Sequence, residues 1–159
     1  MQTLGQKLLR LGPVVRYSSR QALDEDVVSL RAEGFRCIEY DCSGWTLHTD
    51  KYHEIIEPVL RATADQVNVP GAGAPGLNEF FDMFRSEGAG TAFVFRGWDA
   101  FARADGQAWN LLQLIASASR RRLIGAEWLL AMILVADMHL EIKPVGAVAV
   151  QIRQSGRPL

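Results

Sequence analysis

The sequence predicts an α/β fold, a small parallel β-sheet flanked by helices, and three observations support this prediction. Strand-like and helix-like segments alternate along most of the 159 residues. That order places parallel strands in one sheet with right-handed crossovers. Residues 128–135 are almost all apolar between Gly125 and Asp137, which is typical of a central strand covered on both faces. Residues 36–40 mix polar and apolar side chains, so we expect that strand at an edge.

Length and composition predict one globular domain. A chain of 159 residues with 48% hydrophobic and 22% charged residues can form a substantial core. Residues 1–14 are weakly patterned, and we expect them to form an N-terminal arm that is either loose or a docking element. Residues 15–159 are then the domain.

The charge and cysteine content bound the partners and the compartment. A formal net charge of −1 gives no electrostatic footprint for nucleic acid. The three arginines at 120–122 fall at the end of a predicted helix, where cations suit the helix dipole. No signal-peptide pattern is evident, residues 129–136 are too short to span a bilayer, and two cysteines do not make a disulfide framework. We therefore expect a cytoplasmic protein without direct contacts to nucleic acid or membrane.

Two helix patterns lie in the first sixty residues. Ser19 is suited to cap the first helix and Gly34 to end it. A second helix over about residues 49–60 should end or kink near Pro58, which cannot donate to the helical ladder. The apolar sides are predicted to comprise Leu23, Val27, Val28 and Leu30 in the first helix, and Tyr52, Ile55, Ile56 and Val59 in the second.

The second half of the chain predicts two more strands and a long helix. Residues 91–95 form one strand, Asp105 is suited to cap the helix that follows, and residues 128–135 form the buried strand. Residues 145–152 alternate less clearly and are assigned to a last strand. The buried stripe of the long helix is predicted to comprise Ala108, Leu111, Leu112, Ile115 and Ala118.

Residues 76–84 predict a short helix with two different faces, after a loop rich in glycine and proline. Asn78 and Asp82 are four residues apart and therefore share one exposed stripe. The opposite face should pack on a core, because its apolar residues recur at helical spacing. They are Leu77, Phe80, Phe81 and Phe84.

Three segments resemble the barstar family, which are small intracellular inhibitors of ribonucleases. Residues 35–41 resemble the family's first strand with its polar exit. Residues 76–84 resemble its run of glycine, Asn-Leu-Asp-Ala, aromatic and Asp, and residues 95–101 resemble the strand and turn that follow. The order of elements over roughly residues 20–152 agrees with the family's order. The resemblance implies a barstar-like fold with N- and C-terminal extensions, as in longer bacterial members.

The resemblance also implies a function without catalysis, cofactor or metal. The protein would be a ribonuclease inhibitor or immunity protein, as in a toxin–antitoxin pair, monomeric when free. It would block a basic active site, where a carboxylate can replace the substrate phosphate. Asp82 would be the phosphate mimic, Asn78 its hydrogen-bonding neighbour and Phe81 a packed anchor. The implied partner-binding residues are Gly76, Leu77, Asn78, Phe81 and Asp82.

Four positions depart from the family pattern and keep a second interpretation open. Asn78 replaces the first acidic residue of the binding helix, and Gly76 stands where the family usually has Asn. Ser117 aligns approximately with a third acidic contribution, and a Gly/Ala/Pro run replaces the family's Pro-aromatic-Gly loop. The protein could therefore be a barstar-fold interaction module whose partner is not a nuclease.

A nucleotide-binding enzyme is the third interpretation. Residues 71–76 match the G-x-G-x-x-G pattern, and Asp99 lies at about the expected distance after a strand. The strand that this motif needs, at residues 67–69, is very short before Pro70, and too little chain follows for a full dinucleotide fold. These observations favour a plain loop.

Other reactive residues lack the spacing of known sites. Two cysteines and two histidines fit neither a zinc finger nor a paired C-x-x-C site. The serines lack a nucleophile-elbow sequence, and spacing suggests no partner for the third histidine. Each of the four tryptophans is a possible binding anchor. These residues are Cys37, Cys42, His48 and His53; Ser43, Ser117, Ser119 and His139; and Trp45, Trp98, Trp109 and Trp128.

Overall fold

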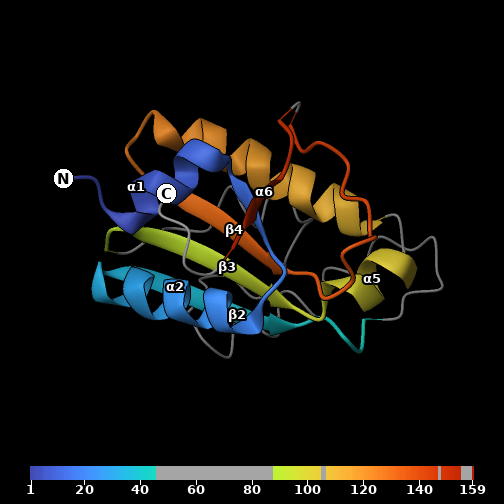
Figure 1. Cartoon of the computed structure of the whole chain (residues 1–159). Helices are drawn as coiled ribbons and strands as arrows, with labels where there is room; N and C mark the ends of the chain where they lie inside the picture. Colours follow the sequence, from blue (N-terminus) through green and yellow to red (C-terminus); the bar gives the residue numbers. More distant parts are fainter. Residues whose placement is uncertain (46–87, 105–106, 147, 155–158) are drawn as a thin grey trace, which may run out of the picture.

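The protein has an α/β fold in which helices flank an all-parallel sheet (Figure 1). In this computed structural model the described residues are 1–45, 88–104, 107–146, 148–154 and 159. Within them the helices are α1 (Leu4–Leu11), α2 (Arg20–Ala32), α5 (Trp98–Ala104) and α6 (Gln107–Leu123). The strands are β1 (Val14–Tyr17), β2 (Phe35–Asp41), β3 (Gly90–Arg96), β4 (Leu129–Leu134) and β5 (Gln151–Arg153).

The order of the described strands is β2-β3-β4-β1-β5. Two predictions from the sequence are confirmed, because the apolar strand β4 is central and the mixed strand β2 lies at an edge. Successive side chains of a strand point to opposite faces of the sheet. In β4, Leu129, Ala131 and Ile133 accordingly face one core, while Leu130 and Met132 face the other. The helices α1 and α2 cover the second face, and α5 and α6 cover the first (Figure 1).

Helix α2 begins and ends where the sequence predicts. The Ser19 side chain caps the helix by accepting a hydrogen bond from the amide of Ala22, and Gly34 follows the last turn with a positive φ of 89°. Leu23, Val27 and Leu30 are buried as predicted, but Val28 is 66% exposed. Val28 lies about 100° around the helix from Val27, which turns its side chain towards solvent.

Residues 1–14, expected to be either a loose arm or a docking element, contain α1 and the first residue of β1, which pack on the rest of the fold. Thr3 and Gln6 form a capping box at the start of α1. The Glu33 carboxylate, from the end of α2, accepts hydrogen bonds from the amides of Leu4 at 2.6 Å and Gly5 at 3.0 Å. A Cβ on Gly5 would lie 2.4 Å from the ring of Phe35, so only glycine permits this approach. Residues 1–14 therefore contribute to the core between α2 and the sheet, where the α1 residue Leu8 is fully buried.

The second half of the chain follows the prediction closely. The five residues predicted for the stripe of α6 are buried, and the three arginines at 120–122 occupy its last turn. The predicted last strand is shorter than expected: β5 covers only Gln151–Arg153, and Val145 and Val148 form an isolated bridge before it. The proposed cap Asp105 and the predicted helix at 49–60 lie outside the described residues.

A buried polar cluster holds β5 against the rest of the molecule. The Asp26 carboxylate in α2 accepts a hydrogen bond of 2.7 Å from the Tyr17 hydroxyl in β1. The same carboxylate forms an ion pair of 3.1 Å with Arg153 in β5. Only 8% of the Asp26 side chain and 16% of the Arg153 side chain are exposed. Because both charges are largely removed from water, each depends on the other for compensation.

Substitution of a charged residue into β4 should unfold the protein. An uncompensated buried charge costs about 3–5 kcal/mol, which is a large part of the stability of a domain. We expect Leu130→Asp and Ile133→Asp each to abolish the cooperative urea transition followed by circular dichroism. Ile152→Asp is the control, because Ile152 is 53% exposed on the edge strand β5. A cooperative transition of Leu130→Asp at the wild-type midpoint would contradict the central position of β4.

Removal of Arg153 should destabilise the protein more than removal of the whole charge pair. Arg153→Met leaves Asp26 buried without its cation, and we expect a loss of about 3–5 kcal/mol in the free energy of unfolding. The double variant Arg153→Met/Asp26→Asn should recover part of that loss, because no buried charge remains. Urea denaturation of the three proteins measures both values. If the double variant is less stable than Arg153→Met, then Arg153 does not stabilise the protein by compensating the buried charge of Asp26.

Candidate functional site

The partner-binding residues implied by the sequence, Gly76, Leu77, Asn78, Phe81 and Asp82, lie outside the described residues, as do the glycine motif at 71–76 and both His48 and His53. The described chain stops at Trp45, just after the carboxyl end of β2, and resumes at Gly88, just before β3. The geometry that follows therefore concerns the sheet and helices on either side of that segment.

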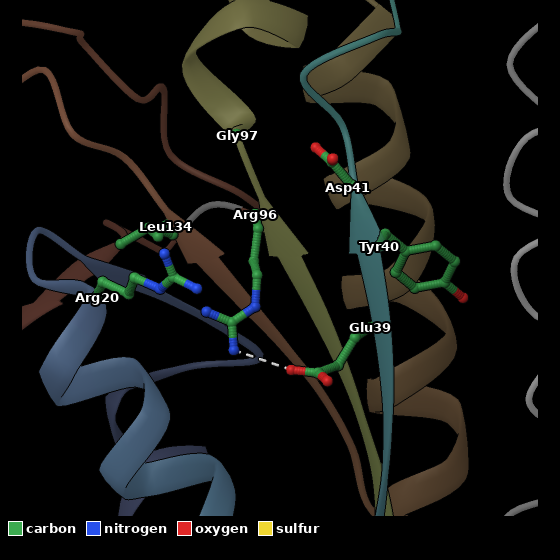
Figure 2. Close-up of a pocket in the computed structure, with 7 residues that line it drawn as sticks. All are labelled: Arg20, Glu39, Tyr40, Asp41, Arg96, Gly97 and Leu134. Carbon is green, nitrogen blue, oxygen red and sulfur yellow. Dashed lines mark hydrogen bonds and ion pairs between the residues drawn. The ribbon is translucent and has the colours of Figure 1, made fainter.

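An open charged pocket lies at the carboxyl ends of the strands (Figure 2). Its volume is about 520 Å³. It is bounded by the ends of β2, β3 and β4 and by the first residue of α2. The residues that line this carboxyl-edge pocket are Arg20, Glu39, Tyr40, Asp41, Arg96, Gly97 and Leu134.

The path of the chain explains why this edge is hollowed. After β1 the chain enters α2 on one face of the sheet, whereas after β3 it enters α5 and α6 on the other face. The segment after the neighbouring strand β4 also packs on the α6 side, through Leu140 and Ile142. The chain therefore leaves the neighbouring strands β1 and β4 towards opposite faces of the sheet. Such divergence opens a crevice at the carboxyl ends of the strands, which is the usual ligand position in open parallel sheets.

Arg96 organises the charges of the pocket. Its Nη2 atom donates to Asp24 of α2 at 2.7 Å and to Glu39 of β2 at 2.9 Å. Burial acts to lower the pKa of Arg96, but the hydrogen bonds with Glu39 and Asp24 outweigh burial and raise it. Arg31 also contacts Glu39, at 3.4 Å. One arginine therefore joins β3 to a neighbouring strand and to the helix above the sheet.

The loop after β2 is fixed by its own short contacts. One oxygen of Asp41 accepts hydrogen bonds from both the amide and the hydroxyl of Ser43, and these bonds lower the pKa of the Asp41 carboxyl. Gly97 has a φ of 67°, and a Cβ there would lie 3.0 Å from the amide nitrogen of Ser43. Glycine at 97 thus allows the turns that follow β2 and β3 to lie close together at the pocket.

Asp99 has a structural partner in the described chain. Its carboxylate accepts hydrogen bonds from the amides of Ala136 at 3.1 Å and Asp137 at 2.7 Å. Arg16 approaches the same loop, donating to the carbonyls of Leu140 and Asp137. This arrangement accounts for the acidic residue of the suspected nucleotide motif without a ribose, since both of its oxygens bind the loop that follows β4.

The other suspected reactive residues are distributed rather than brought together. Within the described residues, no group of three or more His, Cys, Asp or Glu side chains could hold a metal ion. Burial raises the pKa of the thiols of Cys37 and Cys42, which disfavours the thiolate. The serines bind neighbouring groups: Ser43 binds Asp41, Ser119 binds the carbonyl of Leu129, and Ser117 accepts from Arg121.

Trp109 is the most exposed of the four tryptophans. Trp98 begins α5 and is 1% exposed, and Trp45 packs edge-on against Phe101 with centroids 5.2 Å apart. Trp109 is 36% exposed and donates its indole N–H to the carbonyl of Pro144. It borders a smaller groove of about 220 Å³ between α5, α6 and residues 140–143.

Comparison with protein-family models, with curated proteins and with solved structures finds no match for this chain. Among the described residues, no helix is long and apolar enough to cross a membrane.

The segments named from the sequence, residues 35–41 and 95–101, contain Glu39, Asp41 and Arg96, but the sequence did not bring these residues together as a site and gave no sign of Arg20. One signal was present. Arg96 and Gly97 directly follow the apolar run Phe93-Val94-Phe95. A charged residue and a glycine at the carboxyl end of a buried parallel strand are typical of a site at that edge.

Loss of the Asp99 carboxylate should loosen the loop after β4. Asp99→Ala removes two acceptors from backbone amides, and we expect the free energy of unfolding to fall by about 1–3 kcal/mol. Hydrogen exchange at the amides of Ala136 and Asp137 should accelerate more than exchange in β4. Asp24→Ala is a useful comparison, since among the described residues the Asp24 carboxylate contacts Arg96 and Arg20 and no backbone amide. Unchanged exchange at 136 and 137 would show that Asp99 does not hold the loop.

Proposed function

We propose that the protein is a non-catalytic inhibitor of a ribonuclease, of the immunity type. It would cover the basic active site of the enzyme with Leu77, Asn78, Phe81 and Asp82 and with the loop that ends at Gly76. In this proposal the Asp82 carboxylate replaces a substrate phosphate and accepts charge-assisted hydrogen bonds. The protein is monomeric until it meets its partner.

One observation supports this proposal more than any other. Two of the three segments that carry the resemblance, residues 35–41 and 95–101, lie beside each other in the fold. Strands β2 and β3 are parallel neighbours in a register that pairs Tyr40 with Phe95 and Asp41 with Arg96. Helix α6 then leads to β4, which pairs with the other edge of β3. The described elements therefore occur in the order on which the resemblance depends.

The aromatic packing at these segments gives the resemblance a physical basis. The rings of Tyr40 and Phe95 are stacked with centroids 4.7 Å apart, and Trp98 meets Phe95 edge-on at 5.3 Å. Trp45, the last described residue before the proposed binding segment, meets Phe101 in the same cluster. The motif residues thus serve to fix the scaffold from which the binding segment departs, and a rigid scaffold lowers the entropy cost of binding.

The charge distribution favours a second candidate, an interaction module whose partner is not a nuclease. Asp24 and Glu39 at the described carboxyl edge are both paired with Arg96, so they add little to a negative field. The formal net charge of −1 is also small. An inhibitor that attracts a basic enzyme over a distance needs a larger excess of acids.

Inhibition of a ribonuclease tests the proposal directly. The enzymes to assay are small basic ribonucleases from the native cell, beginning with any that a neighbouring gene encodes. We expect cleavage of a fluorogenic RNA to fall in proportion to added protein and to stop at a one-to-one ratio. Capture from extract of the native cell, followed by mass spectrometry, identifies the partner independently. Stable capture of a partner without nuclease activity would favour the interaction module.

The proposed site predicts unequal effects of two acidic residues on binding. Asp82→Ala should weaken binding by about 2–5 kcal/mol, because it removes a charge-assisted contact from a desolvated interface. Glu87→Ala should cost about 1 kcal/mol or less, as expected of a charge at the rim. Asn78→Asp should tighten binding if the partner pocket is basic. Calorimetry with the captured partner gives all three values, and equal, small losses for the two alanine variants would place the interface elsewhere.

A further inference from the structure

We propose that strand β5 pairs in antiparallel direction with β5 of a second copy of this chain, so that the sheet continues from one molecule into the other. Among the described strands, β5 lies at one edge of the sheet. The inference is independent of the proposed ribonuclease inhibition, because none of its residues belongs to the segment at 76–84. It rests on outward-pointing backbone groups, on an edge without exposed charge and on an open groove beside the strand.

The outer edge of β5 presents a backbone donor and acceptor at Ile152. The backbone N–H and C=O groups of successive residues in a strand point alternately to its two sides. The Tyr17 carbonyl accepts from the amide of Val135, so the odd-numbered residues of β1 face β4 and Arg16 faces β5. Arg16 is paired with Ile152, and in a parallel ladder only one residue of such a pair turns its backbone groups towards the other strand. The N–H and C=O of Ile152 therefore point outwards, where no described residue forms a hydrogen bond with them.

The side chains of β5 do not block this edge. Natural edge strands are commonly protected from further pairing by lysine, proline or a bulge. The three residues of β5 include no lysine and no proline, and the one charged side chain, Arg153, is directed to Asp26 on the α2 side. Ile152 points to the opposite side and is 53% exposed. The edge thus offers an apolar side chain and no charge that would repel a second strand.

An open groove beside β5 gives an added strand access to the edge. The groove has a volume of about 530 Å³. It is lined by Leu11 of α1, by residues 150–154 and by Leu159, which is 40% exposed. An extended chain in this groove can therefore reach the outward backbone groups of Ile152.

A second copy of β5 satisfies this edge by symmetry. With a twofold axis at Ile152, the two Ile152 residues lie directly opposite each other and exchange both N–H···O=C hydrogen bonds, as one type of antiparallel pair does. Their exposed side chains then meet on the same face and remove apolar surface from water. Gln151 lies opposite Arg153 of the other copy, so no like charges face each other. The sequence of β5 is therefore complementary to itself.

The length of β5 limits the affinity of this contact. Stable interfaces usually bury at least about 1,200 Å² in total, and a three-residue strand from each copy buries less. We expect dimers at high micromolar concentration and monomers at the low concentrations of an inhibition assay.

Sedimentation equilibrium of the full chain tests the pairing. The weight-average mass should rise from the monomer value of 17.6 kDa towards twice that value between low and high micromolar concentration. Ile152→Asp should stay monomeric because two carboxylates would face each other, and Ile152→Pro because proline lacks the outward N–H. Ile124→Asp is the matched control. Ile124 is 93% exposed in the turn after α6, so this variant should dimerise as the wild type does. Cooperative urea transitions show that the variants are folded.

Hydrogen exchange of the wild type locates the interface. Exchange at the amide of Ile152 should slow as the concentration rises, whereas exchange at Gln151 and Arg153, whose amides face β1, should stay the same. The proposal fails if the mass remains that of the monomer at every concentration, or if Ile152→Asp and Ile124→Asp dimerise alike. It also fails if dimers form without protection of the Ile152 amide. Protection of that amide by a peptide of alternating threonine and valine, in a chain that never dimerises, would assign the edge to a foreign strand instead.

Discussion

The burial of β4 on both faces is the constraint from which the rest of the structure follows. Its residues alternate between two cores, so each face of the sheet must be covered by apolar side chains. The helices α5 and α6 provide one cover and α1 and α2 provide the other. The helices α1 and α2 both precede β2 in the chain, so about the first fifth of the 159 residues supplies one layer of the domain. Without this layer Leu130, Met132, Ala92 and Val94 would face water.

Hydrogen bonds and ion pairs of charged side chains connect these layers. Arg96 bonds α2 to β2 and β3, Glu33 bonds the end of α2 to the start of α1, and Asp26 bonds α2 to Arg153 in β5. All three contacts involve the same helix. Helix α2 therefore serves as the hub between the N-terminal layer, the edge strand β2 and the C-terminal strand, and its position sets the width of the carboxyl-edge pocket.

The sequence predicted those parts of the fold in which one physical signal dominates. The apolar run of β4 predicts a buried strand and the apolar stripe of α6 predicts a helix with one buried face, because only burial explains either pattern. The helix α1 was missed because it is eight residues long, although the pair Thr3 and Gln6 is a capping-box signal. Strand β1 was missed because four residues are too few to show a period. Val28 was wrongly assigned to the buried side of α2 because it is apolar and directly follows the buried residue Val27.

The charged site was predictable only in part, since its residues come from separate elements. Arg96 and Asp41 are 55 positions apart in the chain, yet the parallel register places them opposite each other. Arg20 reaches the same edge only because α2 packs on β1, β4 and β2, which sequence spacing does not reveal. Asp99 could be interpreted as a ribose ligand because its contacts with a distant loop are not visible in the sequence. Its real partners, the amides of residues 136 and 137, lie 37 and 38 positions further on.

The described groups with a shifted pKa keep their charges fixed around neutral pH. Of the described groups whose pKa is shifted, those of Asp41 and Asp137 move lower, through hydrogen bonds with Ser43 and with the amide of His139. Burial moves the pKa of Tyr17, Cys37 and Cys42 higher. The pKa of Arg96 is raised as well, because its hydrogen bonds with Glu39 and Asp24 outweigh burial. All six shifts lead away from pH 7, so the charges of these groups stay constant across the physiological range. A constant pattern of fixed charges is what recognition of a charged partner or ligand requires.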